Sequence, residues 1–140
     1  MATVITIQDF SEQVARGIHQ FGTHTFRLAL CSAAPVGTNT QLTNLTQIAY
    51  TNVTGGVAPA VTIGISEAAG VTTVTGNQVD IVATGAVPSF QYYALYNDTA
   101  TNKNLVMAWN HGSVVTLAAG ETFSIKFNNT ASAGTIFTLT

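Results

Sequence analysis

Histidine and cysteine are the residues of this chain that could hold a metal ion. There are three histidines, His19, His24 and His111, and one cysteine, Cys31. Structural zinc sites take four such ligands from short, regular spacings, which these positions do not provide. We therefore expect neither a metal nor a cofactor. Cys31 ends an apolar stretch and is expected to be buried and unreactive, and His111 is expected to lie in a turn.

Residues for nucleophilic or acid–base catalysis are equally scarce. The chain contains neither a Gly-x-Ser-x-Gly elbow nor a glycine-rich phosphate loop. Four of its six acidic residues fall at a helix start or in turn-like positions. These four are Asp9, Glu12, Asp98 and Glu121. Only Asp80 and Glu67 are left as a pair that could face each other across a glycosidase cleft. We expect no catalytic residues and no enzymatic activity.

Aromatic residues are the remaining group with binding chemistry. Tyr92, Tyr93, Tyr96 and Trp109 fall on two predicted strands joined by a polar loop. Such rings can stack on sugars or anchor a protein interface. Packing in the core is the ordinary alternative for them.

The charge content limits the possible partners. Charged residues make up 7% of the 140 residues, against about a quarter in an average protein, and 46% are hydrophobic. Four cations are too few to neutralise a run of phosphates, so we expect no nucleic-acid partner and no membrane contact. No apolar run reaches membrane-spanning length. We expect a soluble protein made in the cytoplasm, with a neutral, polar surface.

Hydrophobic spacing predicts one short helix near the N-terminus. Apolar residues recur on one helical face over residues 9–21, and the regular part runs from Asp9 to His19. Asp9 and Glu12 are placed to form a capping box, and Gly17 or Gly22 is expected to end the helix. Residues 1–8 precede it as a possible N-terminal arm, with a short strand over Thr3 to Ile7.

The rest of the chain is predicted to be strand, with a period of two. The expected strands are 26–31, 47–51, 61–65, 71–75, 78–83, 90–96, 104–110, 113–117, 122–128 and 135–139. The expected turns are Thr54-Gly55-Gly56, Gly76-Asn77, Asn97-Asp98, His111-Gly112 and Ala119-Gly120. Residues 32–59 are expected to be mostly surface loop. This pattern predicts an all-β antiparallel sandwich or barrel that occupies residues 1–140 as a single domain.

The segment from Phe90 to Tyr96 is apolar on both faces, with Tyr93 and Leu95 on one side. Such a strand is either central in its sheet or covered by a partner. It favours self-association, with a homodimer ahead of a trimer.

Two segments resemble a family of small tailed-bacteriophage structural proteins, the head-decoration or cement proteins. FSEQVARGIHQFGTHTFRLA (Phe10 to Ala29) resembles the family's opening helix, its Gly-(Ile/Val)-His-x-Phe-Gly turn and its first strand. The matching residues are Gly17, Ile18, His19, Phe21, Gly22, Thr25, Phe26, Arg27, Leu28, Ala29 and Leu30. The stretch from Tyr92 to Asn128 is similar to the family's second signature. The resemblance implies a jelly-roll-like β-sandwich whose oligomers clamp neighbouring subunits of the major capsid protein, on the exterior of a virion.

We expect the capsid contact to use uncharged segments, namely the N-terminal arm and loop 36–46. The interface residues expected in the arm and in the two-faced strand are Val4, Ile5, Ile7, Tyr93 and Leu95. An arm of β-branched residues can add to a neighbour's sheet edge, or it can pair within its own sandwich. The alternative function is a lectin-like binding module of a tail or head fibre that contacts host glycans.

Overall fold

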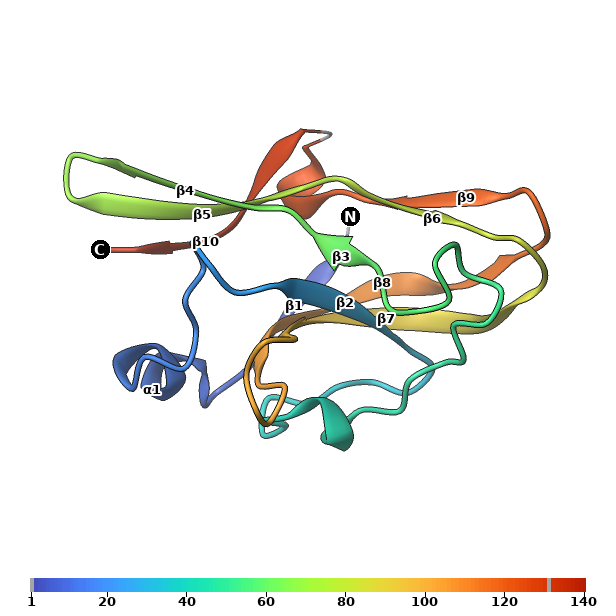
Figure 1. Cartoon of the computed structure of the whole chain (residues 1–140), viewed down its shortest axis with the longest axis horizontal. Coiled ribbons are helices and arrows are strands. Elements are labelled where there is room, and N and C mark those ends of the chain that lie inside the picture. The colour runs from blue at the N-terminus through green and yellow to red at the C-terminus, as the bar shows by residue number, and fades with distance from the viewer. Residues whose placement is uncertain (1, 131) are drawn as a thin grey trace.

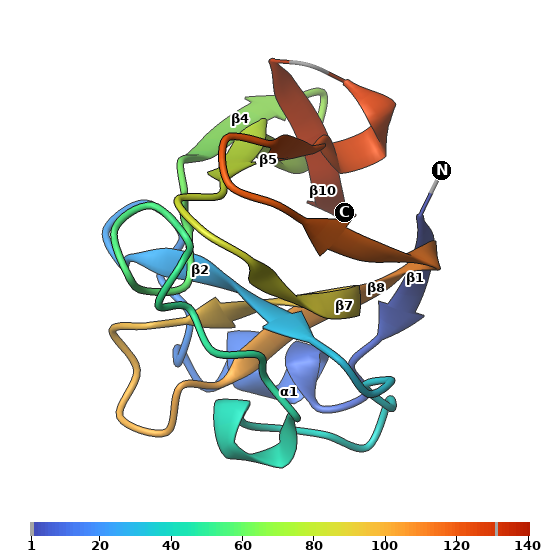
Figure 2. The ribbon, with the colours of Figure 1, turned by 90° about the vertical axis from the view of Figure 1, so that its right-hand side faces the viewer.

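Short alternating segments place this chain in two facing layers of antiparallel strands, seen in the computed structural model of residues 2–130 and 132–140 (Figures 1 and 2). The first layer is a five-stranded sheet with strand order β1-β8-β7-β2-β3. Its strands are β1 (Thr3–Thr6), β8 (Leu105–Leu117), β7 (Val87–Asn97), β2 (Phe26–Cys31) and β3 (Ala60–Val61). The predicted all-β antiparallel sandwich with one short N-terminal helix is confirmed.

The second layer consists of two smaller sheets, β10-β5-β4 and β6-β9. Its strands are β10 (Ala133–Leu139), β5 (Val71–Asn77), β4 (Ile63–Ala68), β6 (Val79–Val82) and β9 (Thr122–Ile125). In Figure 1 the β4–β5 hairpin and β10 extend to one end of this layer, and β6 and β9 extend to the other. The predicted turn at Gly76-Asn77 is wrong, because β5 runs through both residues and the chain then enters the other small sheet as β6.

Both faces of the five-stranded sheet carry buried side chains. Phe26, Leu28 and Leu30 of β2 pack between the layers, whereas Ala29 and Cys31 belong to a second cluster on the opposite face. The helix and loop 32–59 contribute partly buried side chains to that second cluster. Each large side chain buried in this way contributes about 1.5–3 kcal/mol. The sandwich therefore has a third, irregular layer.

The layers on both faces of the sheet explain why the segment from Phe90 to Tyr96 is apolar on both faces. β7 is central, paired with β2 on one side and β8 on the other. Tyr93 is 5% exposed and Leu95 is 0% exposed in the inter-layer core, so the expectation that they form an interface is corrected. Burial within the chain accounts for the apolar pattern without a partner.

An irregularity in the β7–β8 ladder changes one side-chain assignment. Phe90 pairs with Val115, but Tyr92 pairs with Asn110, so β8 carries extra residues at this point. Phe90 consequently joins Tyr93 in the inter-layer core, although simple alternation puts it on the face of Tyr92. The predicted hairpin turn at His111-Gly112 is wrong, since β8 is continuous there and the glycine belongs to a bulge.

The helix α1 spans Phe10–Ala15 and is shorter than expected. Gly17 ends it in a left-handed conformation, with φ of +74°. The predicted capping box does not form, because the Asp9 carboxylate makes no cap hydrogen bond. Asp9 instead accepts a hydrogen bond from Gln13 Nε2 at 2.8 Å, and Glu12 pairs with Arg16.

Residues 32–59 are loop, as expected, apart from a short 3-10 helix η1 (Leu42–Asn44). The predicted strand over residues 47–51 is wrong. Gln47 makes only an isolated bridge to Cys31, and the backbone of Ile48 bonds to that of Leu30. A second 3-10 segment, η2 (Phe127–Asn129), follows β9.

Candidate functional site

The N-terminal segment is an edge strand of the chain's own sheet. β1 pairs with β8 from Thr3 opposite Asn110 to Thr6 opposite Met107. No described strand lies on the other side of β1, so one row of its backbone groups is free to pair. Val4 is 50% exposed and Ile5 is partly exposed. The sequence left open whether this segment pairs within its own sandwich or adds to a neighbour's sheet. It does pair within its own sandwich, and its other edge has no described strand beside it.

Ile7 differs from its neighbours in the arm. It is 2% exposed and belongs to the cluster beneath the outer face of the five-stranded sheet. The expectation that Ile7 is an interface residue is therefore corrected: its side chain fixes the end of β1 to the core.

Loop 36–46 lies directly beside this strand. The backbone N–H of Gln8 donates to the carbonyl of Gly37 at 2.9 Å. A Cβ atom on Gly37 would approach the Thr6 carbonyl to 2.9 Å, so only glycine allows this close approach. The two segments expected separately to contact a capsid thus form one continuous surface, Thr3–Thr6 with residues 36–46, called here the β1–loop surface.

The β1–loop surface is ordered and uncharged. Asn39 accepts a hydrogen bond from the Val36 backbone at 2.8 Å, and Asn44 and Gln41 form a reciprocal capping box. Neither Thr3–Thr6 nor residues 36–46 include a charged side chain. Val36, at 51% exposed, presents apolar area as Val4 does. The surface therefore offers apolar contact and backbone hydrogen bonds, both of which resist screening by salt.

The side chain of Asn97 is a buried hydrogen-bonding centre that joins the N-terminal segment to the end of β7. Its Nδ2 lies 3.2 Å from His19 Nδ1 and 2.8 Å from His24 Nδ1. The same nitrogen lies 3.2 Å from the Ile18 carbonyl. Because an amide nitrogen only donates, a histidine Nδ1 that bonds to it must accept. His19 Nε2 then carries the proton and donates to Gln13 Oε1 at 2.6 Å.

An Nδ1 atom that accepts a hydrogen bond requires the His19 ring to be neutral. Burial and the nearby His24 lower the pKa of His19, whereas a hydrogen bond with the Leu105 backbone raises it by a smaller amount. The resulting pKa is about 4. The sequence singled out His19 and His24 as too scattered for a metal site, but it gave no sign that Asn97 joins them.

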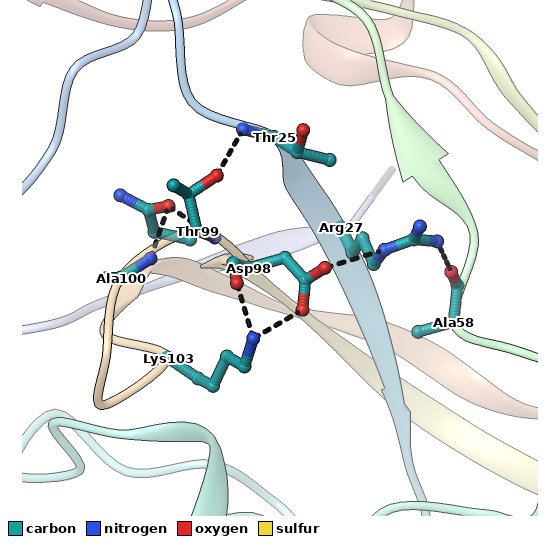
Figure 3. A network of polar contacts seen from close by, with 8 residues as sticks. Thr25, Arg27, Ala58, Asp98, Thr99, Ala100 and Lys103 are labelled. Carbon is teal, nitrogen blue, oxygen red and sulfur yellow. Dashed lines mark hydrogen bonds and ion pairs between the residues drawn. The ribbon is translucent and has the colours of Figure 1, made fainter.

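An ion-pair network covers the same end of the sandwich (Figure 3). Arg27 Nε lies 3.2 Å from the Asp98 carboxylate and its Nη1 donates to the Ala58 carbonyl at 2.7 Å. Lys103 Nζ lies 3.1 Å from the same carboxylate. Partial burial raises the pKa of Asp98, but hydrogen bonds and charge from Lys103 and Arg27 outweigh it and lower the pKa overall. The network ties β2 to the β7–β8 loop, which is a structural role.

The four aromatic residues do not form a common binding platform. Tyr93 and Trp109 pack together between the layers, with ring centroids 5.6 Å apart. Tyr92 and Tyr96 lie on the opposite face of the sheet, and Tyr96 is buried. No shared ring surface is exposed for stacking on a sugar.

The residues weighed for catalysis are separated or occupied. Burial raises the pKa of Cys31 to about 12, which keeps it a thiol. Glu67 accepts a hydrogen bond from the Gly70 backbone in the β4–β5 hairpin. Asp80 lies on β6 and accepts hydrogen bonds from Ser124 and Gln78. Within residues 2–130 and 132–140, no three His, Cys, Asp or Glu side chains gather into a metal-binding group.

No protein-family model, curated protein or solved structure matches this chain. In the part of the chain that the structure describes, no helix is long and apolar enough to cross a membrane. Function is therefore inferred from the geometry and chemistry of the chain's own residues.

Proposed function

We propose that this chain is a structural virion protein that decorates the outer surface of a bacteriophage capsid and stabilises the shell of major capsid protein. The observation that carries the proposal is the β1–loop surface. It combines an unpaired strand edge with a hydrogen-bonded, uncharged loop, which suits strand addition to a neighbouring chain. The two signature segments that resemble cement proteins support the same assignment.

The charge distribution favours a clamp over an electrostatically driven contact. Arg16 pairs with Glu12, and Arg27 and Lys103 both pair with Asp98. Exposed ion pairs contribute little and weaken in salt. Many copies on a lattice, each with a modest apolar interface, gain strength by avidity.

Self-association is part of the proposal, with a dimer ahead of a trimer. β7 no longer argues for it, because its two apolar faces are covered within the chain. The support is now the resemblance and the open edges of the sheets, such as β1 and β4. The competing proposal, a glycan-binding fibre module, loses the exposed aromatic platform on which it rested.

Binding to isolated shells tests the proposed contact. Purified protein is sedimented with shells of the major capsid protein, and three valine variants of similar exposure are compared. Val4→Lys and Val36→Lys place a charge on the β1–loop surface, whereas Val57→Lys adds one beside β3, at the opposite edge of the same sheet. Val57 is 51% exposed and is the matched control.

We expect Val4→Lys and Val36→Lys each to weaken shell binding by about tenfold or more, because an ammonium group must be desolvated in the contact. Val57→Lys should bind as the unchanged protein does. Equal binding by all three variants, or a loss confined to Val57→Lys, would show that this surface is not the contact.

A further inference from the structure

A cleft opens between the two layers beside β1. It has a volume of about 250 Å³, and its walls come from Ala2 and Val4, from β10, and from residues 126–129. Tyr93 and Trp109 line its floor. A second hollow of about 290 Å³ adjoins it and shares Ala2, Tyr93, Lys126 and Asn129. This size suits one ring-sized unit of a ligand and is too small for a drug-sized molecule.

The floor holds two polar groups that have no hydrogen-bond partner among the described residues. Tyr93 is 5% exposed and Trp109 is 7% exposed, yet neither the phenol hydroxyl nor the indole N–H bonds to any described residue. No fully enclosed side-chain nitrogen or oxygen in the described residues is without a partner. Both residues line the cleft. Burial raises the pKa of Tyr93 to about 12, so its hydroxyl remains a donor as well as an acceptor.

The mouth of the cleft adds further hydrogen-bonding groups. Asn128 and Asn129 both have positive φ, 49° and 53°, a conformation that asparagine tolerates better than most residues. Both are exposed, and each carries an amide that can donate and accept. Lys126 lies beside them and makes no ion pair with the described residues.

We propose that this cleft binds a hexose unit of a glycan, an activity beyond capsid decoration. A sugar hydroxyl donates and accepts at once, which matches a donor-only indole, a phenol and two carboxamides in a small space. The ring's C–H faces suit the apolar walls contributed by Val4 and Ile136. Lys126 is placed to meet a carboxylate where the sugar is acidic.

Other ligand classes fit the same groups less well. A phosphate needs several cations or a backbone nest, and one lysine is present. An acyl chain would bury the Tyr93 and Trp109 polar groups without partners, which is costly. A nucleobase needs a free ring face, but Trp109 is packed between Tyr93 and Phe127, with ring centroids 5.6 and 5.4 Å away.

The fluorescence of Trp109 provides a direct test, because it is the chain's single tryptophan. The protein is titrated with the methyl glycosides of glucose, galactose, N-acetylglucosamine and glucuronic acid, and with glycerol as a polyol that lacks a ring. We expect a saturable shift in emission with at least one glycoside, at a dissociation constant of about 0.1–10 mM, and none with glycerol. If glucuronic acid binds more tightly than the neutral glycosides and its affinity falls with salt, Lys126 binds the sugar carboxylate. If a neutral glycoside binds as tightly as glucuronic acid, the sugar hydroxyls account for recognition.

Two variants locate the site, and a third controls for them. Tyr93→Phe removes only the hydroxyl and should weaken sugar binding by about 2- to 10-fold. Ala2→Gln should abolish binding by filling the rim shared by both hollows. Because Ala2 packs against the core, the thermal stability of this variant is measured alongside. Tyr92→Phe, the neighbouring position on the opposite face, should change nothing.

The proposal is overturned if no glycoside gives a saturable shift, or if Tyr93→Phe binds as tightly as Tyr92→Phe. It is also overturned if the uncharged peptide Thr-Val-Ile-Thr saturates the signal and no sugar does, since the cleft would then be a strand-docking hollow. Shell sedimentation of Tyr93→Phe should remain unchanged, so failure of the sugar site and failure of the decoration role are distinguishable.

Discussion

The amide nitrogen of Asn97 lies 3.2 Å from Nδ1 of His19, although 78 residues separate the two in the chain. The contact fastens the segment after α1 to the point where β7 enters its loop. Asn97 is 0% exposed and its Oδ1 also accepts from the backbone of Thr99 and Ala100. One side chain thus fixes the loop and the N-terminal segment together.

Removing this amide should be costly. We expect Asn97→Ala to lower the free energy of unfolding by about 2–4 kcal/mol, because several buried partners lose their hydrogen bonds at once. Urea denaturation measures the change. Asn102→Ala, in the exposed part of the same loop, should stay within about 0.5 kcal/mol of the unchanged protein. Equal effects of the two variants would mean that Asn97 is an ordinary turn residue.

The histidine cluster predicts acid sensitivity. The folded-state pKa of His19 is about 4, below its ordinary value of 6.5, so the unfolded chain binds the proton more readily. The stability that depends on neutral His19 is fully present above about pH 6.5 and is lost as the pH falls toward 4. Between pH 7.5 and 4.5 we expect the free energy of unfolding to fall by about 2 kcal/mol.

A pair of variants assigns this pH dependence. His19→Gln keeps hydrogen-bonding groups but cannot titrate, so its stability should vary much less across the same range. His111→Gln, in the bulge of β8, should keep the full slope. If both variants retain the slope, another group is responsible.

The spacing of hydrophobic residues predicted the local structure best in segments with one clear period. In the predicted strand 122–128, Ile125 is buried in the core between the layers, as the alternation requires. The strand is shorter than predicted, because β9 ends at Ile125 and the buried Phe127 begins η2. The positions of glycine in the sequence did not predict a single local structure, because glycine occurs in turns, in bulges and where two backbones approach closely. Gly112 was assigned to a turn but lies in a bulge, and the turn at Ala69-Gly70 was not predicted.

The site depends on contacts that local sequence does not encode. Val4 and Ile7 were both expected to be interface residues. Val4 is 50% exposed, but Ile7 is buried because it packs against the outer face of the sheet. The contact of Gly37 with Thr6 and Gln8 joins segments some thirty residues apart. No short-range pattern indicates such a contact, nor the cleft, whose lining comes from both layers and from η2.

Two glycines of the second layer and its connections should respond differently to alanine. A Cβ on Gly134 would lie 1.8 Å from the Phe127 carbonyl oxygen, so β10 could not pack against η2. We expect Gly134→Ala to cost about 3 kcal/mol or more. Gly120 has φ of +86° but open space around it, so Gly120→Ala should cost about 1–2 kcal/mol from the backbone alone. Thermal unfolding of both variants ranks them, and the reverse order would disprove the close approach.

Low surface charge predicts that binding to capsid shells is nearly independent of salt. Between 50 and 200 mM salt, a protein that neutralises several phosphates loses about 10³-fold or more in affinity. The β1–loop surface has no charged side chain, so its affinity for shells should change by less than about threefold over that range. Sedimentation at several salt concentrations measures this, and a steep decline would point to a charged contact elsewhere on the chain.

A reconstruction of the purified virion that carries this chain tests the central claim most directly. The account predicts hundreds of copies on the exterior of the shell, each bridging subunits of the major capsid protein, with Thr3–Thr6 and loop 36–46 at the contact. A few copies confined to the tail or to fibres, with none on the shell, would contradict it.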